Sequence, residues 1–174
     1  QTIIKNIIYS FNQFLYVHIN NNSLQFKPLG KIITMIRKAK KTDISAIIEI
    51  EKLSFRVPWP DYLFRSILGS PGFVVYEKDN TVIGYVVIDI IKNYTHLANI
   101  AVLPEYRRIK IGSILLGWCE QFGKKRGANA LILEVREKNT STQRFYQKNG
   151  FYIKGVVPEY YIDDNAIIMV KKIQ

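Results

Sequence analysis

The 174-residue chain is poor in the residues that build disulfide-stapled or metal-bearing proteins. It contains one cysteine, Cys119, and two histidines. A single cysteine cannot form an internal disulfide, and so few thiols and imidazoles exclude a multi-cysteine zinc site and leave little material for other transition metals. We therefore expect no metal, and the low cysteine content is compatible with a reducing compartment.

Long hydrophobic runs are also absent. Polar or charged residues interrupt every apolar stretch before the roughly 18 residues that a membrane-spanning helix needs. A secretory signal is disfavoured because Asn6, Asn12, Gln13 and His18 break the first apolar stretch. We expect a soluble, cytoplasmic protein that has no membrane partner.

Acidic residues are scarce relative to basic ones. The chain has 14 Asp and Glu against 25 Lys and Arg, a formal net charge of +11. Such a field attracts nucleic acid, ribosomes, acidic peptides or a phosphate-rich cofactor, and charge alone does not choose among them. The 48% hydrophobic content excludes disordered and fibrous classes, and the length fits one domain.

Residues 1–34 differ from the rest of the chain. They contain three lysines, no acidic residue and no arginine. The run Ile7–Ile19 is either a helix or strand that packs on the domain or a partner, or part of an upstream extension. We treat 1–34 as an N-terminal extension of unknown role and 35–174 as the domain.

Regular hydrophobic periodicity begins at Met35. Strands are expected at 35–38, 73–77, 82–91, 96–103, 130–135, 151–157 and 166–172, and helices at 44–55, 61–68, 111–126 and 140–149. The first helix has an apolar stripe of Ile44, Ile47, Ile48 and Leu53, and the third has one of Ile114, Leu115, Trp118, Cys119 and Phe122. Cys119 is thus expected to be a core thiol. Thr42 or Asp43 is expected to cap the first helix, and Thr140 with Gln143 to form a capping box. This element order predicts a mixed sheet flanked by helices.

A basic loop joins the expected strand ending at Val102 to the helix beginning at Ile111. A helix N-terminus presents unpaired backbone N–H groups and the positive end of its dipole, and Arg107, Arg108 and Lys110 add full charges there. This arrangement suits a pyrophosphate. A solvated basic turn before an ordinary helix is the alternative.

The motif Ile100-Ala101-Val102 followed by Arg107-x-x-x-x-Gly112 resembles motif A of the GNAT superfamily of acetyl-CoA-dependent N-acetyltransferases. Later segments resemble protein N-terminal acetyltransferases of the RimI type and their archaeal relatives: Leu133-Glu134-Val135-Arg136, Asn139, Phe145-Tyr146, Asn149-Gly150-Phe151, and 159–169. The resemblance covers about 35–172. It implies the α/β GNAT fold, a central mixed, mostly antiparallel sheet of about seven strands flanked by about four helices.

The resemblance implies acetyl-CoA as cosubstrate. Its pyrophosphate would lie on the loop and first helical turn, at Arg107, Arg108, Ile109, Lys110, Ile111, Gly112 and Ser113. Its pantetheine arm would pair with Ile100, Ala101 and Val102 and contact Asn139. Lys110 stands where the family carries a glycine, so it either crowds the loop or contacts a phosphate. We favour retained binding.

Three residues match catalytic positions of the family. Glu134 resembles the general base, although its alternative is an ordinary carboxylate paired with Arg136 or Lys138. Tyr146 matches the tyrosine that contacts the cofactor and protonates the departing thiolate, or is a core aromatic. His96 matches a histidine that binds a second water in some archaeal relatives, or is structural.

Two aromatic segments resemble the walls that grip a peptide N-terminus: Val57, Pro58 and Trp59 on one side, and Tyr160 and Tyr161 on the other. These aromatics could equally be core residues. Segment 57–59 lacks the acidic specificity residue of some archaeal relatives.

The expected activity is acetyl transfer to the α-amine of proteins or peptides by direct attack in a ternary complex. We expect protein or peptide N-termini, including those of ribosomal proteins and the ribosome, as partners, and a monomer or homodimer with no direct nucleic-acid function. The alternatives are a small-amine acetyltransferase of the polyamine type and a basic ribosome- or RNA-binding module that has lost catalysis.

Overall fold

The computed structural model describes residues 15–20, 23–28 and 35–173, and its contacts divide the chain into two units, 1–37 and 38–174. In the first unit, β1 (Leu15–Asn20) and β2 (Ser23–Pro28) form an antiparallel hairpin. The other residues of 1–34, including the start of the Ile7–Ile19 run, lie outside the described residues.

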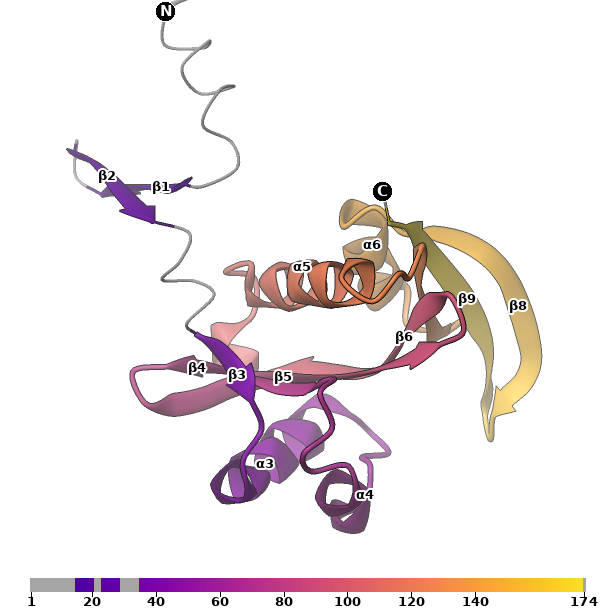
Figure 1. Ribbon diagram of the computed structural model, residues 1–174. Coiled ribbons are helices and arrows are strands. Elements are labelled where there is room, and N and C mark those ends of the chain that lie inside the picture. The colour runs from indigo at the N-terminus through magenta and orange to yellow at the C-terminus, as the bar shows by residue number, and fades with distance from the viewer. Residues whose placement is uncertain (1–14, 21–22, 29–34, 174) are drawn as a thin grey trace, which may run out of the picture. The chain divides into compact units, whose positions relative to one another are not determined.

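A seven-stranded sheet has the order β3-β4-β5-β6-β7-β9-β8 (Figure 1). The strands are β3 (Ile36–Lys38), β4 (Phe73–Lys78), β5 (Thr81–Ile91), β6 (Tyr94–Val102), β7 (Ala130–Arg136), β8 (Tyr152–Tyr161) and β9 (Asp164–Lys172). Neighbours β6 and β7 run parallel, whereas the pairs β4–β5, β5–β6, β7–β9 and β8–β9 are antiparallel. The predicted mixed, mostly antiparallel sheet is confirmed.

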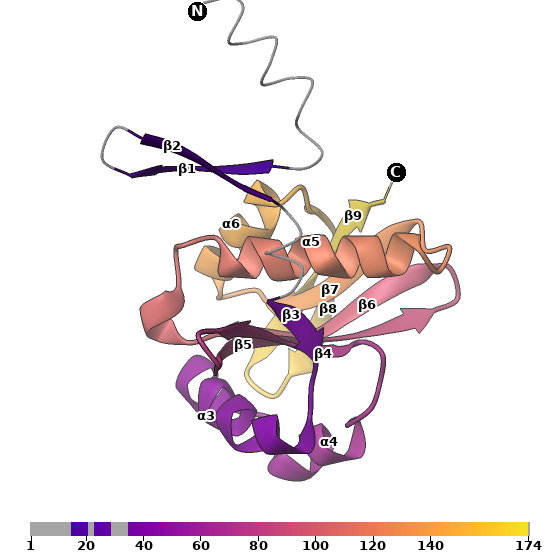
Figure 2. The ribbon, with the colours of Figure 1, turned by 60° about the vertical axis from the view of Figure 1, so that its left-hand side comes forward.

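Four helices cover the two faces of the sheet. Helices α3 (Ile44–Ser54) and α4 (Asp61–Ser66) lie on one face, and α5 (Ile111–Lys124) and α6 (Thr140–Lys148) lie on the other, as Figures 1 and 2 show. No helix in the described part of the chain is long and apolar enough to cross a membrane.

The sheet splits between β6 and β7. Their ladder pairs only Tyr94 with Ala130, Thr95 with Leu131 and His96 with Ile132. From Leu97 onward the ladder of β6 is with β5 alone, while β7 continues along β9. A bulge lies at the same place: Val87 pairs with Asn99 and Ile88 with Leu97, which leaves Ala98 as an extra residue. The split and the bulge leave backbone groups of β6 outside the regular ladder.

The core beneath the sheet is centred on aromatic rings. Phe64 of α4 packs edge-on against Tyr85, with ring centroids 5.5 Å apart. Helix α3 buries Ile44, Ile47 and Ile50, but Leu53 is 54% exposed, so its place in the predicted stripe is wrong. At 3.6 residues per turn, the face through Ile47 continues at 50–51 and 54, and Leu53 lies off it.

Helix α5 packs closely on the opposite face. Leu115 and Cys119 are buried, which confirms the core thiol, and Leu116 and Gly123 are buried as well. A Cβ on Gly123 would lie 2.1 Å from the Thr95 hydroxyl oxygen, so a glycine is required for this approach. Trp118 and Phe122 of the predicted stripe are only half-buried, and their rings stack on each other 5.0 Å apart.

The predicted helix caps need correction. Asn139, not Thr140, is the N-cap of α6, and its Oδ1 accepts the backbone N–H of Thr142 at 3.2 Å. The Gln143 amide donates to backbone carbonyls of the preceding turn instead of closing a capping box. Asp43 is the N-cap residue of α3, as predicted, and its side chain accepts the backbone N–H of Lys40 at 2.7 Å in the 3-10 turn that precedes the helix.

Candidate active site

His96 and Glu134 meet at the fork of the split sheet. His96 is the last β6 residue that pairs with β7, and Glu134 lies two residues beyond its partner, Ile132. Nε2 of His96 is 2.7 Å from Oε2 of Glu134, and both side chains are about three-quarters buried. Arg136 and Lys138, the alternative partners considered for Glu134, form ion pairs with aspartates of the β8–β9 turn.

The Glu134 contact controls the charge of His96. Its hydrogen bond raises the pKa of His96 above 6.5, and the negative charges of Glu134 and Asp89 raise it further. Burial acts in the opposite direction but is outweighed. The fork therefore holds a carboxylate hydrogen-bonded to an imidazole whose protonated form the contact favours.

Tyr146 lies on α6 and is buried, with 6% of its surface exposed. Its ring is 5.5 Å from that of Phe151. Burial raises the pKa of the Tyr146 phenol, and proximity to Cys119 and Tyr161 raises it further. The hydroxyl therefore keeps its proton at neutral pH and is able to donate it.

Tyr160 and Tyr161 end strand β8, which is longer than the predicted 151–157. The strand continues through a register shift near Glu159, whose φ is +53°. The two tyrosine rings meet edge to face at 5.0 Å, and the Arg136 guanidinium lies 4.2 Å from the centre of the Tyr161 ring. Burial raises the pKa of Tyr161, and the charge of Glu134 raises it further. Arg136, which contacts the Tyr161 ring, is two residues along β7 from Glu134, so this wall lies near the fork.

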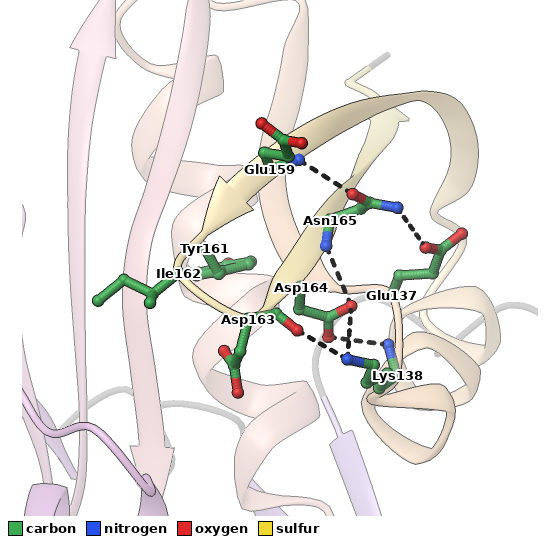
Figure 3. A pocket seen from close by; sticks show the side chains of 8 residues that line it. All are labelled: Glu137, Lys138, Glu159, Tyr161, Ile162, Asp163, Asp164 and Asn165. Carbon is green, nitrogen blue, oxygen red and sulfur yellow. Dashed lines mark hydrogen bonds and ion pairs between the residues drawn. The ribbon is translucent and has the colours of Figure 1, made fainter.

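A cavity of about 290 Å³ lies at the β8–β9 turn (Figure 3). Its polar groups bond mostly to one another. Asn165 donates to Glu137 at 2.7 Å and accepts the backbone N–H of Glu159 at 2.9 Å, and the Lys138 ammonium donates to the Asp163 carbonyl at 2.7 Å. These bonds tie the turn to the end of β7 and so fix the base of the tyrosine wall.

Asp163 connects this turn to the loop between α3 and α4. Its two carboxylate oxygens contact Arg136 at 2.5 Å and Arg56 at 3.2 Å. The Arg136 hydrogen bond holds the pKa of Asp163 below its usual value. The two predicted substrate walls, distant in sequence, are therefore joined by one exposed carboxylate.

The segment 57–59 divides into an exposed and a half-buried part. Val57 is 67% exposed, whereas Trp59 packs on Phe64 with ring centroids 5.7 Å apart. Val57 is therefore open to an acceptor, and the Trp59 ring belongs to the edge of the core.

Sequence reasoning missed a buried carboxylate under this loop. Glu51 is 1% exposed and accepts the Trp59 backbone N–H at 2.7 Å. The Tyr85 hydroxyl donates to it in a short hydrogen bond, and the Asn99 amide donates to both carboxylate oxygens at 3.3 Å. Burial and the Glu51 charge raise the pKa of Tyr85. The sequence held one signal of this buried carboxylate: Glu51 lies on the same apolar helix face as Ile47.

The basic loop before α5 contains two left-handed residues, Arg108 with φ +63° and Lys110 with φ +70°. Lys110 is the N-cap of α5, and its carbonyl accepts the first helical N–H, that of Ile114. Left-handed backbone favours glycine. A glycine, which the family resemblance implies at this place, adopts this conformation without strain, and here a lysine adopts it.

Gly112, in the first turn of α5, lies against α6. A Cβ there would come within 3.0 Å of the Phe145 ring. The aromatic ring therefore fixes the distance between the two helices beside the loop.

Arg107 lies apart from the start of α5. Its Nε donates to the Val102 carbonyl and its guanidinium to the Ser54 hydroxyl, both at 2.9 Å. Its guanidinium therefore contacts the ends of β6 and α3.

The remaining residues that are predicted to bind the cofactor present mainly backbone groups to a ligand. Ala101 and Ile111 have buried side chains, Ile100, Val102 and Ser113 are half-buried, and Ile109 is 57% exposed. Free N–H groups at the start of α5, exposed Arg108 and Lys110, and unpaired β6 backbone fit a long ligand with a phosphate end. No cluster of three or more potential metal ligands occurs among the described residues.

Comparisons with known proteins identify relatives of this architecture. Residues 44–151 match the sequence profile of the acetyltransferase (GNAT) family. The chain is 35% identical over 139 residues to a putative ribosomal protein bS18-alanine N-acetyltransferase of Bacillus subtilis, covering 77% of this chain and 92% of that protein. An N-alpha-acetyltransferase of Sulfurisphaera tokodaii is 33% identical over 150 residues, with coverage of 77% and 90%.

The fold is shared with a solved relative. The crystal structure of the ribosomal-protein-S18-alanine N-acetyltransferase from Escherichia coli superposes with a TM-score of 0.71 at 29% identity. The match covers 80% of this chain and 93% of that one.

Proposed function

Because the chain belongs to the GNAT acetyltransferase family, we propose that it transfers the acetyl group of acetyl-CoA to the α-amine of protein or peptide N-termini in the cytoplasm. The observation that carries this proposal is the His96–Glu134 pair, which lies at the fork of the sheet beside the tyrosine wall. Relatives named for bS18 and for N-alpha acetylation make a ribosomal-protein N-terminus the first acceptor to test.

The donor half of the site would hold acetyl-CoA along the split. Backbone groups of Ile100–Val102 would bind the pantetheine arm, and the first turn of α5 would bind the pyrophosphate through its N–H groups. Lys110 is exposed and would add a positive charge there. Arg107 would hold the end of β6 in place instead of binding phosphate.

The chemical step needs a neutral amine. A peptide α-amine has a pKa of about 8, against about 10.4 for lysine, so an N-terminus needs only a modest base. When bound, acetyl-CoA supplies an acetyl thioester: the amine nitrogen bonds to the acetyl carbon, and the carbon–sulfur bond breaks with its electron pair on sulfur. Glu134, paired with His96, would take the amine proton directly or through a water.

Tyr146 would return a proton to the sulfur. Burial raises the pKa of its phenol, so the proton is retained at neutral pH. Transfer to a thiolate with a conjugate acid near pKa 8.5 is then uphill and depends on close alignment of the hydroxyl with the sulfur. No acyl-enzyme is involved, because Cys119 is fully buried on α5 and burial raises its pKa.

The acceptor half would lie between the loop that follows α3 and the β8–β9 turn. Val57 would contact the first side chain of the peptide, and Tyr160, 53% exposed, would line the opposite wall. The Arg56–Asp163 contact closes this entrance on one side.

Calorimetric titration with acetyl-CoA, followed by thiol-release assays with peptides that begin with Ala, Ser or Met, tests the proposal. We expect binding and peptide-dependent release of CoA. Glu134→Gln and Tyr146→Phe should each lower kcat by roughly 10²-fold or more with an unchanged Kd for acetyl-CoA, because general acid–base groups contribute about 10²- to 10⁴-fold. Glu120→Gln, on the far part of α5, serves as the control.

The outcomes separate the activity from its rivals. If the protein binds acetyl-CoA and acetylates spermidine but no peptide, the acceptor is a small amine and not a peptide N-terminus. Absence of acetyl-CoA binding, together with salt-sensitive RNA binding, would overturn the transferase proposal altogether.

A further inference from the structure

Glu51 is a buried carboxylate that the proposed chemistry does not use. It lies in the last turns of α3 and is 1% exposed. A charge buried away from water is costly unless hydrogen bonds compensate for the lost hydration. Its donors are the Trp59 backbone, the Tyr85 hydroxyl and the Asn99 amide. One carboxylate therefore collects donors from three separate segments.

These three segments belong to different parts of the site. Trp59 ends the loop whose Val57 faces the acceptor, and Asn99 directly precedes the β6 residues assigned to the pantetheine arm. Tyr85 lies on β5, and its ring packs edge-on against Phe64, the same side chain on which Trp59 rests. Glu51 thus joins the acceptor loop to the donor strand through the core.

We propose that Glu51 is a positioning residue that fixes the loop 55–60 against β6 and thereby sets acceptor affinity and selectivity for the first residue. The inference rests on the proposed acetyltransferase function. It assigns Glu51 no contact with either substrate.

Packing alone does not supply this constraint. The Trp59–Phe64 contact holds the indole ring, but the loop backbone is held by the 2.7 Å hydrogen bond from the Trp59 N–H to Glu51. Pro58 and Pro60 lack N–H groups. In the triplet Pro58-Trp59-Pro60, the backbone hydrogen bond can therefore be donated by Trp59 alone. Loss of the acceptor would release Val57, two residues away.

The test compares three substitutions on the same helix. Glu51→Met keeps a similar unbranched volume and removes the acceptor, whereas Glu51→Gln keeps an acceptor oxygen and removes the charge. Glu49→Met changes an exposed glutamate two residues away and is the matched control. For each we measure the peptide KM, kcat, the ratio of kcat/KM for Ala-first and Met-first peptides, and the Kd for acetyl-CoA.

We expect Glu51→Met to raise the peptide KM by about tenfold, the equivalent of one hydrogen bond, and to change the selectivity ratio. The Kd for acetyl-CoA should stay within about twofold, because the α5 phosphate loop is untouched. Glu51→Gln should recover most of the lost affinity. A purely structural role would instead reduce the folded fraction and scale all rates together, with KM and selectivity unchanged, and would overturn the proposal.

Hydrogen exchange at the Trp59 amide gives a readout that needs no activity. We expect this amide to be protected in the wild type and to exchange at least tenfold faster in Glu51→Met, with Glu49→Met unchanged. Unchanged exchange in Glu51→Met would overturn the inference. If the wild type acetylates no peptide, the proposed function fails, and the exchange result still decides whether Glu51 anchors the loop. If Glu51→Met does not fold, exchange at Trp59 in Glu51→Gln decides the case: a neutral amide oxygen accepts more weakly than a carboxylate, so this amide should exchange faster than in the wild type, and unchanged exchange would overturn the inference.

Discussion

At neutral pH the His96 imidazole responds to the carboxylate 2.7 Å away more than to its own burial. The folded-state pKa of His96 is raised above 6.5. The resulting stabilisation is fully present below pH 6.5, the value of an unfolded histidine, and is lost as pH rises through the higher folded-state pKa. A raised pKa also means that the His96 ring next to Glu134 keeps its positive charge to a higher pH than a free histidine does.

NMR titration of the imidazole Cε1–H signals tests this assignment. We expect His96 to titrate above 6.5 in the wild type, and to shift downward in Glu134→Gln, because burial then acts without the opposing carboxylate. Asp89→Asn, which removes the smaller contribution, should lower the pKa only slightly. An unchanged pKa in Glu134→Gln would contradict the contact, and His96→Gln identifies the signal.

Individual residues were predictable only where a pattern marked them. Glu134, His96 and Tyr146 were predicted through resemblance, and the structure brings the first two into contact. Cys119 was placed in the core from helical periodicity. Glu51 was missed because hydropathy assigns a glutamate to the surface, and its burial depends on donors that lie 34 and 48 residues away at Tyr85 and Asn99.

At the scale of elements, the start of α5 combines a strained turn with a charge. Lys110 has φ +70°, a conformation that costs an L-residue roughly 1–2 kcal/mol and glycine little. Its exposed side chain is free to follow a phosphate. The backbone conformation and the charge therefore have separable effects on stability and on cofactor binding.

Two variants separate the effects. Lys110→Gly should raise the free energy of unfolding by about 1 kcal/mol, since the left-handed strain is relieved. Lys110→Met keeps the strain and should leave stability nearly unchanged. If the ammonium contacts a phosphate, both should weaken acetyl-CoA binding severalfold at low salt. Denaturant unfolding and calorimetry measure these quantities, with Lys124→Met at the other end of α5 as control. Tighter binding by Lys110→Gly would show that Lys110 crowds the loop.

Helices and strands followed from the sequence to within a few residues because their periodicities of 3.6 and 2 are local properties. The irregular ends of these helices and strands could not be predicted from local periodicity. The α6 cap belongs to Asn139, and β8 runs on past Pro158 to Tyr161, because hydrogen bonds from other segments decide these places. The bulge at Ala98 likewise depends on pairing with β5.

At the scale of the whole molecule, the net charge of +11 acts on an anionic cosubstrate before any contact forms. Long-range attraction of this kind speeds association and is screened within about 10 Å at 0.1 M salt. It should therefore affect encounter with acetyl-CoA more than the chemical step.

Stopped-flow binding measures this effect. Between about 50 mM and 500 mM salt, we expect the association rate constant for acetyl-CoA to fall by roughly tenfold. The turnover number at saturating substrates should change by less than about twofold, since the His96–Glu134 pair is three-quarters buried. An association rate independent of salt would show that the charge lies away from the cofactor entrance.

The contact between Gly112 and the Phe145 ring has a consequence for how this fold diversifies. The Phe145 ring sets the distance between α5 and α6. Few substitutions at this contact would therefore leave the proposed cofactor site unchanged in shape. The acceptor side is closed by exposed groups, with Arg56 and Asp163 in one solvent-accessible ion pair. Mutations there cost little stability. Acceptor preference is accordingly the property that can drift, or be engineered, while the cofactor half is inherited unchanged.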